Sequence, residues 1–362
     1  LKQTLASIEF LSTNEDDTYS THPTKSKRLA AITKGYNNEN YNYQNTKAQM
    51  AEVFIYSGID KFIQNDYDGA VSDFTEAINS ISNVPDIVFF GRGSAKYKLK
   101  DYNSAIADIT TAIEIDPNNT FVYYIRGSAK DDLKDYKGAI ADYTKAIEIN
   151  PNYADAYFNR GVSKGNSEDY KGAIEDFTKA MEINPNFDTY YNRGLAKYYL
   201  EDYKGALADF TEAIKIDPSD ADAYYYRGNS KYNLEDDKGA IADYTKAIEI
   251  NPNYADAYYY RGLSKYYLKV YKGLIADYDK AIEINPNYAD AYYYRGLVKS
   301  DLHLHKEAIE SYSKAIDINP NYTNAYKNRG VSKYHLGDKS GACKDARKAQ
   351  ELGYDASKFI NN

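Results

Sequence analysis

Proline recurs at an almost constant interval along most of this chain. Eight of the nine prolines stand at positions 85, 117, 151, 185, 218, 252, 286 and 320, so neighbouring prolines are 32 to 34 residues apart. The segment KGAIADYTKAIEINPNYADAY occurs unchanged at 137–157 and 238–258. A fixed period of this length is typical of helical-repeat arrays, in which each repeat packs mainly on its neighbours. The period therefore excludes a single globular core and predicts a stack of similar units.

Nine units fit the period: 51–85, 86–119, 120–153, 154–186, 187–220, 221–254, 255–288, 289–322 and 323–356. Position 8 is glycine in every unit, from Gly58 to Gly330, and position 27 is alanine, from Ala77 to Ala349. Position 4 is always Phe or Tyr, and position 24 is aromatic in seven units. Small residues at fixed helical spacing let two antiparallel helices approach closely, and the aromatic residues fill the space between successive hairpins. Each proline stops the second helix of its unit.

Residues 255–288, ADAYYYRGLSKYYLKVYKGLIADYDKAIEINPNY, resemble the tetratricopeptide repeat at nearly every signature position. The resemblance implies an all-α fold, a right-handed superhelical solenoid of antiparallel helical hairpins with a concave, ligand-facing groove. We expect nine repeats in 51–356, a tail at 357–362 and a short helical segment at the N-terminus. The last unit has Ala346 at position 24 and a polar second helix, as expected of a terminal cap. Cys343 is interpreted as a small residue of that cap.

Three charged positions recur through the array. Position 7 is Arg in eight units, position 11 is Lys in all nine, and position 23 is Asp in eight. Folding each hairpin at its turn brings position 23 opposite positions 7 and 11. The sequence therefore predicts that each Asp bridges the Arg and the Lys of its own unit.

Tyrosine is the compositional anomaly, with 42 residues among 362 and no tryptophan. Many tyrosines occupy packing positions, but the excess lies at positions 5, 6, 12 and 13 of the later units. Family resemblance places the binding surface on the first helix of each unit. The predicted partner-binding residues are Asp188, Tyr191, Tyr198, Tyr199, Asp222, Tyr225, Tyr226, Tyr232, Asp256, Tyr259, Tyr260, Tyr266, Tyr267, Asp290, Tyr293 and Tyr294.

Such a tyrosine-lined, acidic-edged groove suits an extended peptide or protein partner, and the acidic edge favours a basic one. The formal net charge is -8, which argues against nucleic-acid binding, and no apolar run is long enough to span a membrane. Tyr, Leu or Val fill most positions at which chaperone-binding repeats carry Lys and Asn, so the sequence does not support that function. Two alternatives stay open: a glycan ligand, or tyrosines that repeat duplication placed on the surface without a ligand.

The first fifty residues carry no repeat pattern. Residues 20–23, STHP, followed by Arg28, resemble the end of the catalytic domain in zinc metallopeptidases of the CAAX prenyl endopeptidase type and their bacterial relatives. The resemblance implies that His22 contacts substrate near the zinc and that Arg28 orients an acidic ligand. We therefore expect 1–35 to be a remnant of a metallopeptidase-like domain and 36–50 to be an Asn- and Tyr-rich linker.

The chain contains no H-E-x-x-H sequence, so it lacks the ligands that hold a catalytic zinc ion. We expect no enzyme activity, cofactor or metal site in this chain, and zinc only if a peptidase domain precedes Leu1. The leading hypothesis is a protein–protein interaction scaffold. The second is that these repeats are the C-terminal part of a bacterial zinc metallopeptidase of the cell envelope or periplasm, where they recruit substrates or partners.

Overall fold

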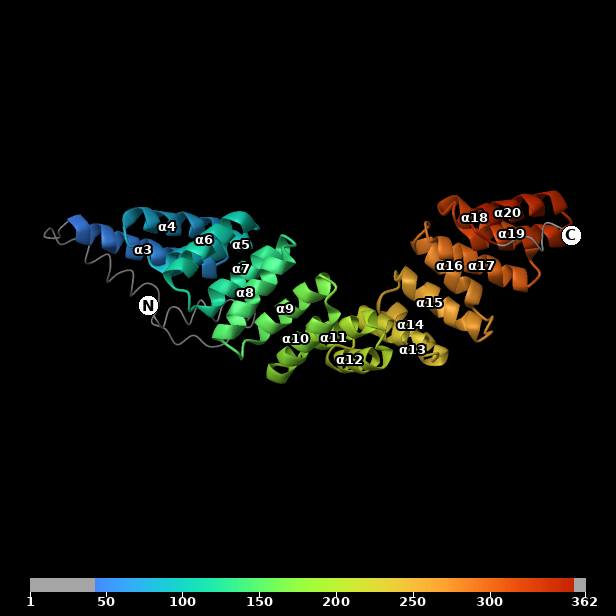
Figure 1. Cartoon of the computed structure of the whole chain (residues 1–362), viewed down its shortest axis with the longest axis horizontal. Helices are drawn as coiled ribbons and strands as arrows, with labels where there is room; N and C mark the ends of the chain where they lie inside the picture. The colour runs from blue at the N-terminus through green and yellow to red at the C-terminus, as the bar shows by residue number, and fades with distance from the viewer. Residues whose placement is uncertain (1–42, 355–362) are drawn as a thin grey trace. The chain divides into compact units, whose positions relative to one another are not determined.

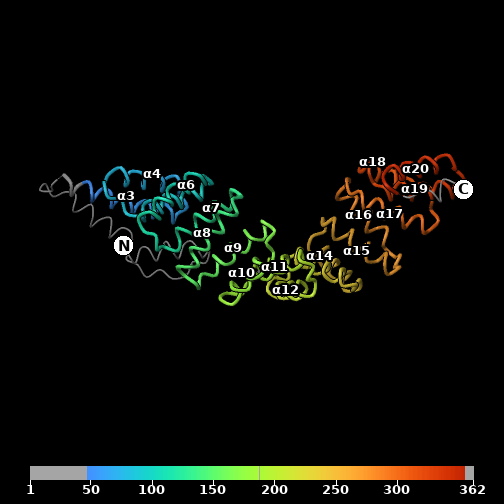
Figure 2. The backbone as a smooth tube through the Cα atoms, viewed as in Figure 1, coloured from blue at the N-terminus to red at the C-terminus, as the bar shows by residue number. Residues whose placement is uncertain are grey.

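The computed structural model describes residues 43–354, and all their regular secondary structure is helical (Figure 1). Eighteen helices follow one another in chain order as nine antiparallel hairpins, so the predicted all-α repeat fold is confirmed. The chain divides into two compact units, residues 1–185 and 186–362. Within each unit, every hairpin packs on the hairpins before and after it (Figure 2).

The described part of the first unit contains four hairpins. They are α3 (Tyr43–Ile63) with α4 (Tyr67–Ser80), α5 (Asp86–Lys98) with α6 (Tyr102–Ile115), α7 (Thr120–Asp132) with α8 (Tyr136–Ile149), and α9 (Ala154–Asn166) with α10 (Tyr170–Ile183).

The second unit contains five hairpins. They are α11 (Phe187–Tyr199) with α12 (Tyr203–Ile216), α13 (Ala221–Asn233) with α14 (Asp237–Ile250), α15 (Ala255–Tyr267) with α16 (Leu274–Ile284), α17 (Ala289–Asp301) with α18 (His305–Ile318), and α19 (Thr323–His335) with α20 (Lys339–Glu351).

The core is built from the small and aromatic positions of the period. The position-20 and position-27 alanines of α14, Ala240 and Ala247, are fully buried, as are most of their equivalents in other hairpins. The aromatic residue at position 24, such as Tyr244, is also fully buried, and its ring lies against the position-8 glycine of the facing helix, here Gly228. This ring occupies the space that a side chain at position 8 would need. The predicted pairing of small and large residues is therefore the basis of hairpin packing.

The turn inside each hairpin has a fixed chemistry. It includes one residue with a left-handed backbone, such as Glu235 with φ of 61°, which is followed by the residue that precedes the second helix in every hairpin except the seventh. In seven hairpins that residue is an aspartate whose carboxylate accepts a hydrogen bond from the backbone N–H three residues later: Asp66, Asp101, Asp135, Asp169, Asp202, Asp236 and Asp338. Such a cap satisfies one of the N–H groups that the first turn of a helix leaves without a partner.

The seventh and eighth hairpins lack this cap because Val270 and Leu304 replace the aspartate. In the eighth hairpin α18 still begins directly after Leu304. In the seventh, α16 begins only at Leu274, after Gly273 with a left-handed φ of 73°, and Val270 and Tyr271 are exposed. Loss of the cap thus coincides with loss of the first turn of α16.

We expect the substitution Val270→Asp to restore that turn and to raise the free energy of unfolding by about 0.5–2 kcal/mol, the usual effect of an N-cap aspartate. Hydrogen exchange should show new protection at the amide of Gly273, which would donate to the new carboxylate. The substitution Leu304→Asp is the matched control, since α18 already has its first turn. It should add stability without extending the helix. An unchanged exchange pattern in the Val270→Asp protein would contradict this account.

Both ends of the described array bear on the predicted boundaries. The helix α3 begins at Tyr43, so the segment predicted to be a linker, 36–50, is helical in its second half. At the other end α20 places Ala346 in the core, while Lys344 and Arg347 are exposed, as expected for a terminal cap. Cys343 is a half-buried free thiol.

Candidate protein-binding surface

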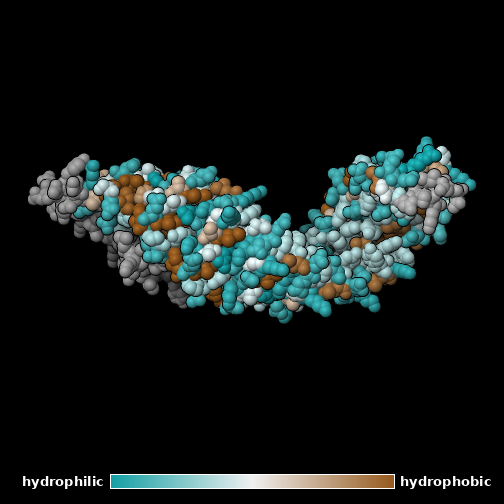
Figure 3. Space-filling view, viewed as in Figure 1, coloured by the Kyte–Doolittle hydropathy of each residue, from teal (hydrophilic) through white to brown (hydrophobic). Residues whose placement is uncertain are grey.

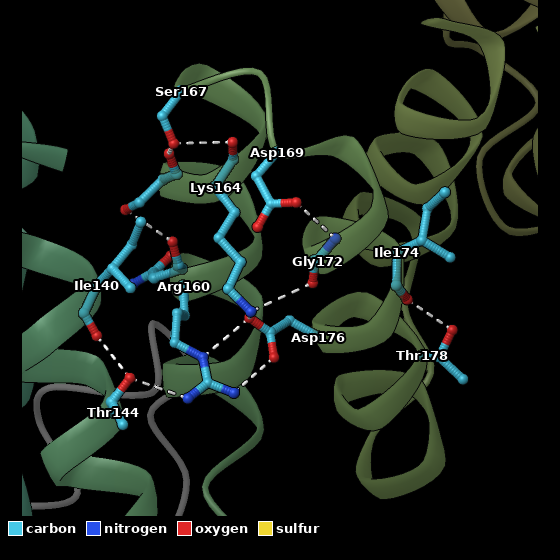
Figure 4. Close-up of polar contacts among 12 residues, drawn as sticks. Ile140, Thr144, Arg160, Lys164, Ser167, Asp169, Gly172, Ile174, Asp176 and Thr178 are labelled. Atoms are coloured by element: carbon cyan, nitrogen blue, oxygen red, sulfur yellow. Dashed lines mark hydrogen bonds and ion pairs between the residues drawn. The ribbon is translucent and has the colours of Figure 1, made fainter. Parts of the chain in front are cut away.

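Three charged side chains meet in the middle of most hairpins, as predicted. In the fourth hairpin Asp176 accepts hydrogen bonds from Nε and Nη2 of Arg160, at 2.9 and 2.6 Å, and pairs with Nζ of Lys164 at 2.8 Å (Figure 4). We call this arrangement the triad. It recurs with nearly the same distances around Asp108, Asp142, Asp209, Asp243, Asp277 and Asp345. Each aspartate is buried, so the bidentate arginine contact replaces the water that the carboxylate loses.

The arginine of the triad also connects neighbouring hairpins. In Figure 4, Nη1 of Arg160 donates to the hydroxyl of Thr144 in the preceding hairpin, at 3.0 Å. Arg92, Arg126 and Arg261 make the same contact with Thr75, Thr110 and Thr245. The guanidinium group also lies over an aromatic ring of its own helix, as Arg261 does over Tyr258. The sequence did not predict this link, because nothing in the period marks the threonine as its partner.

Two hairpins depart from the triad. In the first, Ser57 replaces the arginine and Lys61 alone pairs with Asp73, at 2.8 Å. In the eighth, Ser311 replaces the aspartate. Here Nη1 of Arg295 pairs at 2.6 Å with Asp279, which occupies the threonine position of the preceding hairpin.

The predicted tyrosines of the second unit form one continuous set of ring contacts on α11, α13, α15 and α17. We call this set the tyrosine face: Tyr191, Tyr198, Tyr199, Tyr225, Tyr226, Tyr232, Tyr259, Tyr260, Tyr266, Tyr267, Tyr293 and Tyr294. Ring contacts connect α11 to α13 through Tyr198 and Tyr226, and α13 to α15 through Tyr225 and Tyr260. They connect α15 to α17 through Tyr259 and Tyr294. The tyrosines that share this surface therefore come from helices about 34 residues apart in the sequence.

Exposure varies strongly within the tyrosine face. Tyr199 and Tyr267 each expose 54% of their surface, whereas Tyr259 and Tyr293 expose only 7% and 9%. The other members are half-buried. Tyr259 and Tyr293 thus depart from the expectation that all these residues line an open surface. Their rings are covered by Tyr288 and Tyr322, which lie just before the next hairpin with ring centroids 4.9 Å away.

Three tyrosines of this face stack on rings of the buried core. Tyr226, Tyr260 and Tyr294 stack on the buried position-24 rings of the preceding hairpins, with centroids 5.9–6.3 Å apart. These stacked pairs hold the half-buried tyrosines in one orientation. The surface that they present is therefore preorganised.

The four predicted aspartates of this surface are all exposed. Asp222, Asp256 and Asp290 each accept a hydrogen bond from the hydroxyl of the covering tyrosine: Tyr254, Tyr288 and Tyr322. Asp188 lacks this contact, since Asp220 stands in place of the tyrosine and instead caps α13 through the N–H of Ala223. All four carboxylates remain open to solvent.

Burial raises the pKa of the tyrosine hydroxyls. For Tyr226, burial and then the neighbouring Tyr199 raise the pKa to about 12, and for Tyr266 burial and then Asp301 do the same. The pKa values of Tyr225 and Tyr259 are also raised, mainly by burial. The hydroxyls of these tyrosines therefore stay protonated through the neutral range and can donate hydrogen bonds.

Other residues singled out in the sequence either support the core or lie outside the described residues. Asn229 is buried and accepts a hydrogen bond from the Tyr244 hydroxyl at 2.8 Å, so it supports the core. His22 and Arg28 lie outside the described residues, and their peptidase roles stay predictions.

Between residues 43 and 354 no group of three or more His, Cys, Asp or Glu side chains could hold a metal ion. No helix in that part of the chain could cross a membrane.

The hydropathy of the surface differs between the two units. In the view of Figure 3 the first unit shows many hydrophobic residues, drawn in brown. This unit also has an apolar pocket lined by Ile59, Phe62, Ile63, Phe74, Gly91 and Ser94. The second unit is mostly teal and pale in the same view. An aromatic surface that is also weakly hydrophilic can be exposed to water and can still bind a partner.

Models of known protein families match most of the hairpins. Tetratricopeptide repeat models match residues 88–119, 154–187, 188–220, 221–254 and 289–322, and a further model described as a TPR repeat matches 132–165 and 271–302. Together these matches cover more than half of the chain. None of them includes residues 1–35, so they give no support to the peptidase resemblance. No curated protein is similar enough in sequence to count as a match.

Solved structures show the same fold. The C-terminal part of a TPR repeat-containing protein from Cytophaga hutchinsonii is 18% identical and covers 66% of this chain and 98% of its own, with a TM-score of 0.57. A tetratricopeptide repeat protein from Parabacteroides merdae is 20% identical and covers 69% and 99%, with a TM-score of 0.50. YrrB, described as a TPR protein with an unusual peptide-binding site, is 28% identical and covers 52% and 97%, with a TM-score of 0.48. The repeated hairpins and the family models that match more than half of the chain show that it belongs to the tetratricopeptide-repeat family.

Proposed function

We propose that this chain is a protein-interaction scaffold and that the tyrosine face of its second unit binds an extended basic peptide. The observation that carries the proposal is the distribution of charge on α11, α13 and α15. The Arg and the Lys of each helix are held by the buried aspartate of the same hairpin. The one other charged residue on each helix is an exposed aspartate: Asp188, Asp222 or Asp256. The charge available to a partner there is therefore negative.

The chemistry of the face suits Lys and Arg side chains. An exposed tyrosine ring attracts a cation placed over it, and a nearby carboxylate adds electrostatic attraction. Protonated hydroxyls can donate to the carbonyl groups of an extended backbone. Because tyrosine has only two side-chain torsions to immobilise, such a surface binds with little loss of entropy.

Binding of fluorescent peptides, measured by anisotropy, tests this function. Peptides of about ten residues rich in Lys and Arg should bind, and their affinity should fall as salt is added because the attraction is electrostatic. Replacing both Tyr199 and Tyr267 by Ala should weaken binding about tenfold or more, as expected for aromatic anchors. The control Tyr102→Ala, at the start of α6 in the first unit, should have no effect.

The proposal fails if acidic and basic peptides bind equally well. It also fails if the double variant, folded as judged by circular dichroism, binds as the parent protein does. Preferential binding of uncharged oligosaccharides, with loss in the same double variant, would identify the face as a glycan site instead.

A further inference from the structure

The eighth hairpin keeps both cations of the triad but lacks its carboxylate. In every complete triad, one buried aspartate is held by Nε and Nη2 of the arginine and by Nζ of the lysine, with Nη2 and Nζ both within 2.8 Å of a carboxylate oxygen. In the eighth hairpin Ser311 stands where the aspartate would be, and it is fully buried. The seven complete triads therefore show what this pair of cations binds when a carboxylate is present.

Ser311 cannot replace the missing group. Its Oγ accepts a hydrogen bond from Nε of Arg295 at 3.2 Å and donates its own proton to the carbonyl of Glu307 at 3.0 Å. The side chain ends there, without the two oxygens that an aspartate presents to Nη2 and Nζ. Serine is also neutral, so it offsets none of the positive charge.

Asp279 compensates only one edge of the guanidinium group. It pairs with Nη1 of Arg295, on the side where other arginines contact a threonine, and its side chain is 53% exposed. Among residues 43–354 neither Nη2 of Arg295 nor Nζ of Lys299 has an ion-pair or hydrogen-bond partner. Lys299 is half-buried, and no carboxylate pairs with it in the described part of the chain.

We propose that Arg295 and Lys299 form a binding site for one carboxylate group supplied by another molecule. Nη2 of Arg295 and Nζ of Lys299 donate hydrogen bonds to the carboxylate oxygens, as the same two groups do to the aspartate of a complete triad, and the carboxylate lies beyond the Ser311 hydroxyl. In complete triads the lysine side chains expose 16–21% of their surface and the aspartate side chains 4–9%, so the lysine is the side of the triad nearest to solvent and an ion reaches the pair from there. This inference does not depend on the peptide proposed for the tyrosine face.

The group can come from a small carboxylate ion or from a carboxylate of a bound peptide, and two arms of one experiment distinguish these sources. In the first arm, thermal unfolding of the second unit within the full chain is followed in sodium formate and in sodium chloride at equal ionic strength. Formate should raise the transition temperature in a saturable manner beyond the effect of chloride. In the second arm, isothermal calorimetry compares peptides that end in a free carboxylate with their C-terminal amides.

Variants of the same hairpin provide the controls. Ser311→Asp fills the site with an internal carboxylate and should abolish the formate effect or the preference for the free carboxylate. Lys299→Met removes one cation and should lower the affinity for either probe at least tenfold. Asp243→Ser removes the carboxylate from the triad of the sixth hairpin. It should therefore add a second saturable increase of the transition temperature in formate.

A formate effect that is lost in Ser311→Asp supports the site with a small ion as its ligand. A preference for the free-carboxylate peptide that is lost in Lys299→Met supports it with a peptide ligand. The proposal is overturned if formate acts no differently from chloride and the two peptide forms bind alike. It is also overturned if Ser311→Asp, folded normally, retains either effect.

Discussion

Replacement of Asp243 by Ala should destabilise the second unit by about 3–5 kcal/mol, because it leaves two partly buried cations without their shared carboxylate. Arg227 would lose two hydrogen bonds, at 2.9 and 2.6 Å, and Lys231 an ion pair at 2.7 Å. Since each hairpin stabilises its neighbours, the loss should spread to the adjacent hairpins. Urea denaturation followed by circular dichroism measures the change, and hydrogen exchange locates it.

The same hairpin offers a matched control. Lys246 and Glu249 form an ion pair at 2.7 Å in which both side chains are more than half exposed. Because solvent screens such a pair, Glu249→Ala should cost less than about 1 kcal/mol. If Asp243→Ala costs no more than Glu249→Ala, the triad is not a stabilising device. The buried aspartate would then not neutralise the Arg and the Lys beside the tyrosine face.

The substitution Gly228→Ala should also lower the stability of the second unit. A Cβ atom at Gly228 would stand 2.8 Å from the Tyr244 ring, closer than side chains tolerate. Overpacking of this kind costs about 1–3 kcal/mol, which exceeds the gain of about 1 kcal/mol from replacing glycine by alanine within a helix. Thermal unfolding should therefore show a net loss of stability.

The terminal hairpin supplies the control for this prediction. At Gly330 the opposing position is Ala346, and a Cβ atom would meet its nearest neighbours at 3.3 Å. Gly330→Ala should therefore be close to neutral or stabilising, because helix propensity outweighs a small adjustment of the packing. Equal losses for the two glycines would show that the position-24 ring does not determine the requirement for glycine.

The regularity of the repeat explains why so much of the fold could be predicted. The spacing of prolines, glycines and alanines placed nine hairpins correctly, and the recurrence of Asp, Arg and Lys predicted the triad. These features depend on contacts within one hairpin, such as Arg160 with Asp176, which are 16 residues apart. The helical period alone determines which residues of one hairpin face one another. The limit of α3 was predicted less well, because the first unit has no preceding repeat to define its start.

The candidate surface was predicted only in part. The sequence placed twelve tyrosines and four aspartates on the first helices, and the structure connects the tyrosines by ring contacts. The sequence alone could not show that Tyr259 and Tyr293 are covered while Tyr199 and Tyr267 are exposed. Nor could it show that Asp279 takes over one contact of Arg295, or that Lys299 is left without a carboxylate among the described residues.

The sequence by itself thus determined the helical repeat, the pairing of glycine with aromatic residues and the triads, because each follows from a short period and a single turn. Only the tertiary structure decided which tyrosines are exposed, and that Asp279 pairs with Arg295 while Lys299 has no carboxylate partner among residues 43–354. Those properties depend on how closely each hairpin approaches the next, which brings together residues from successive repeats. The distance between them is set by packing rather than by sequence spacing.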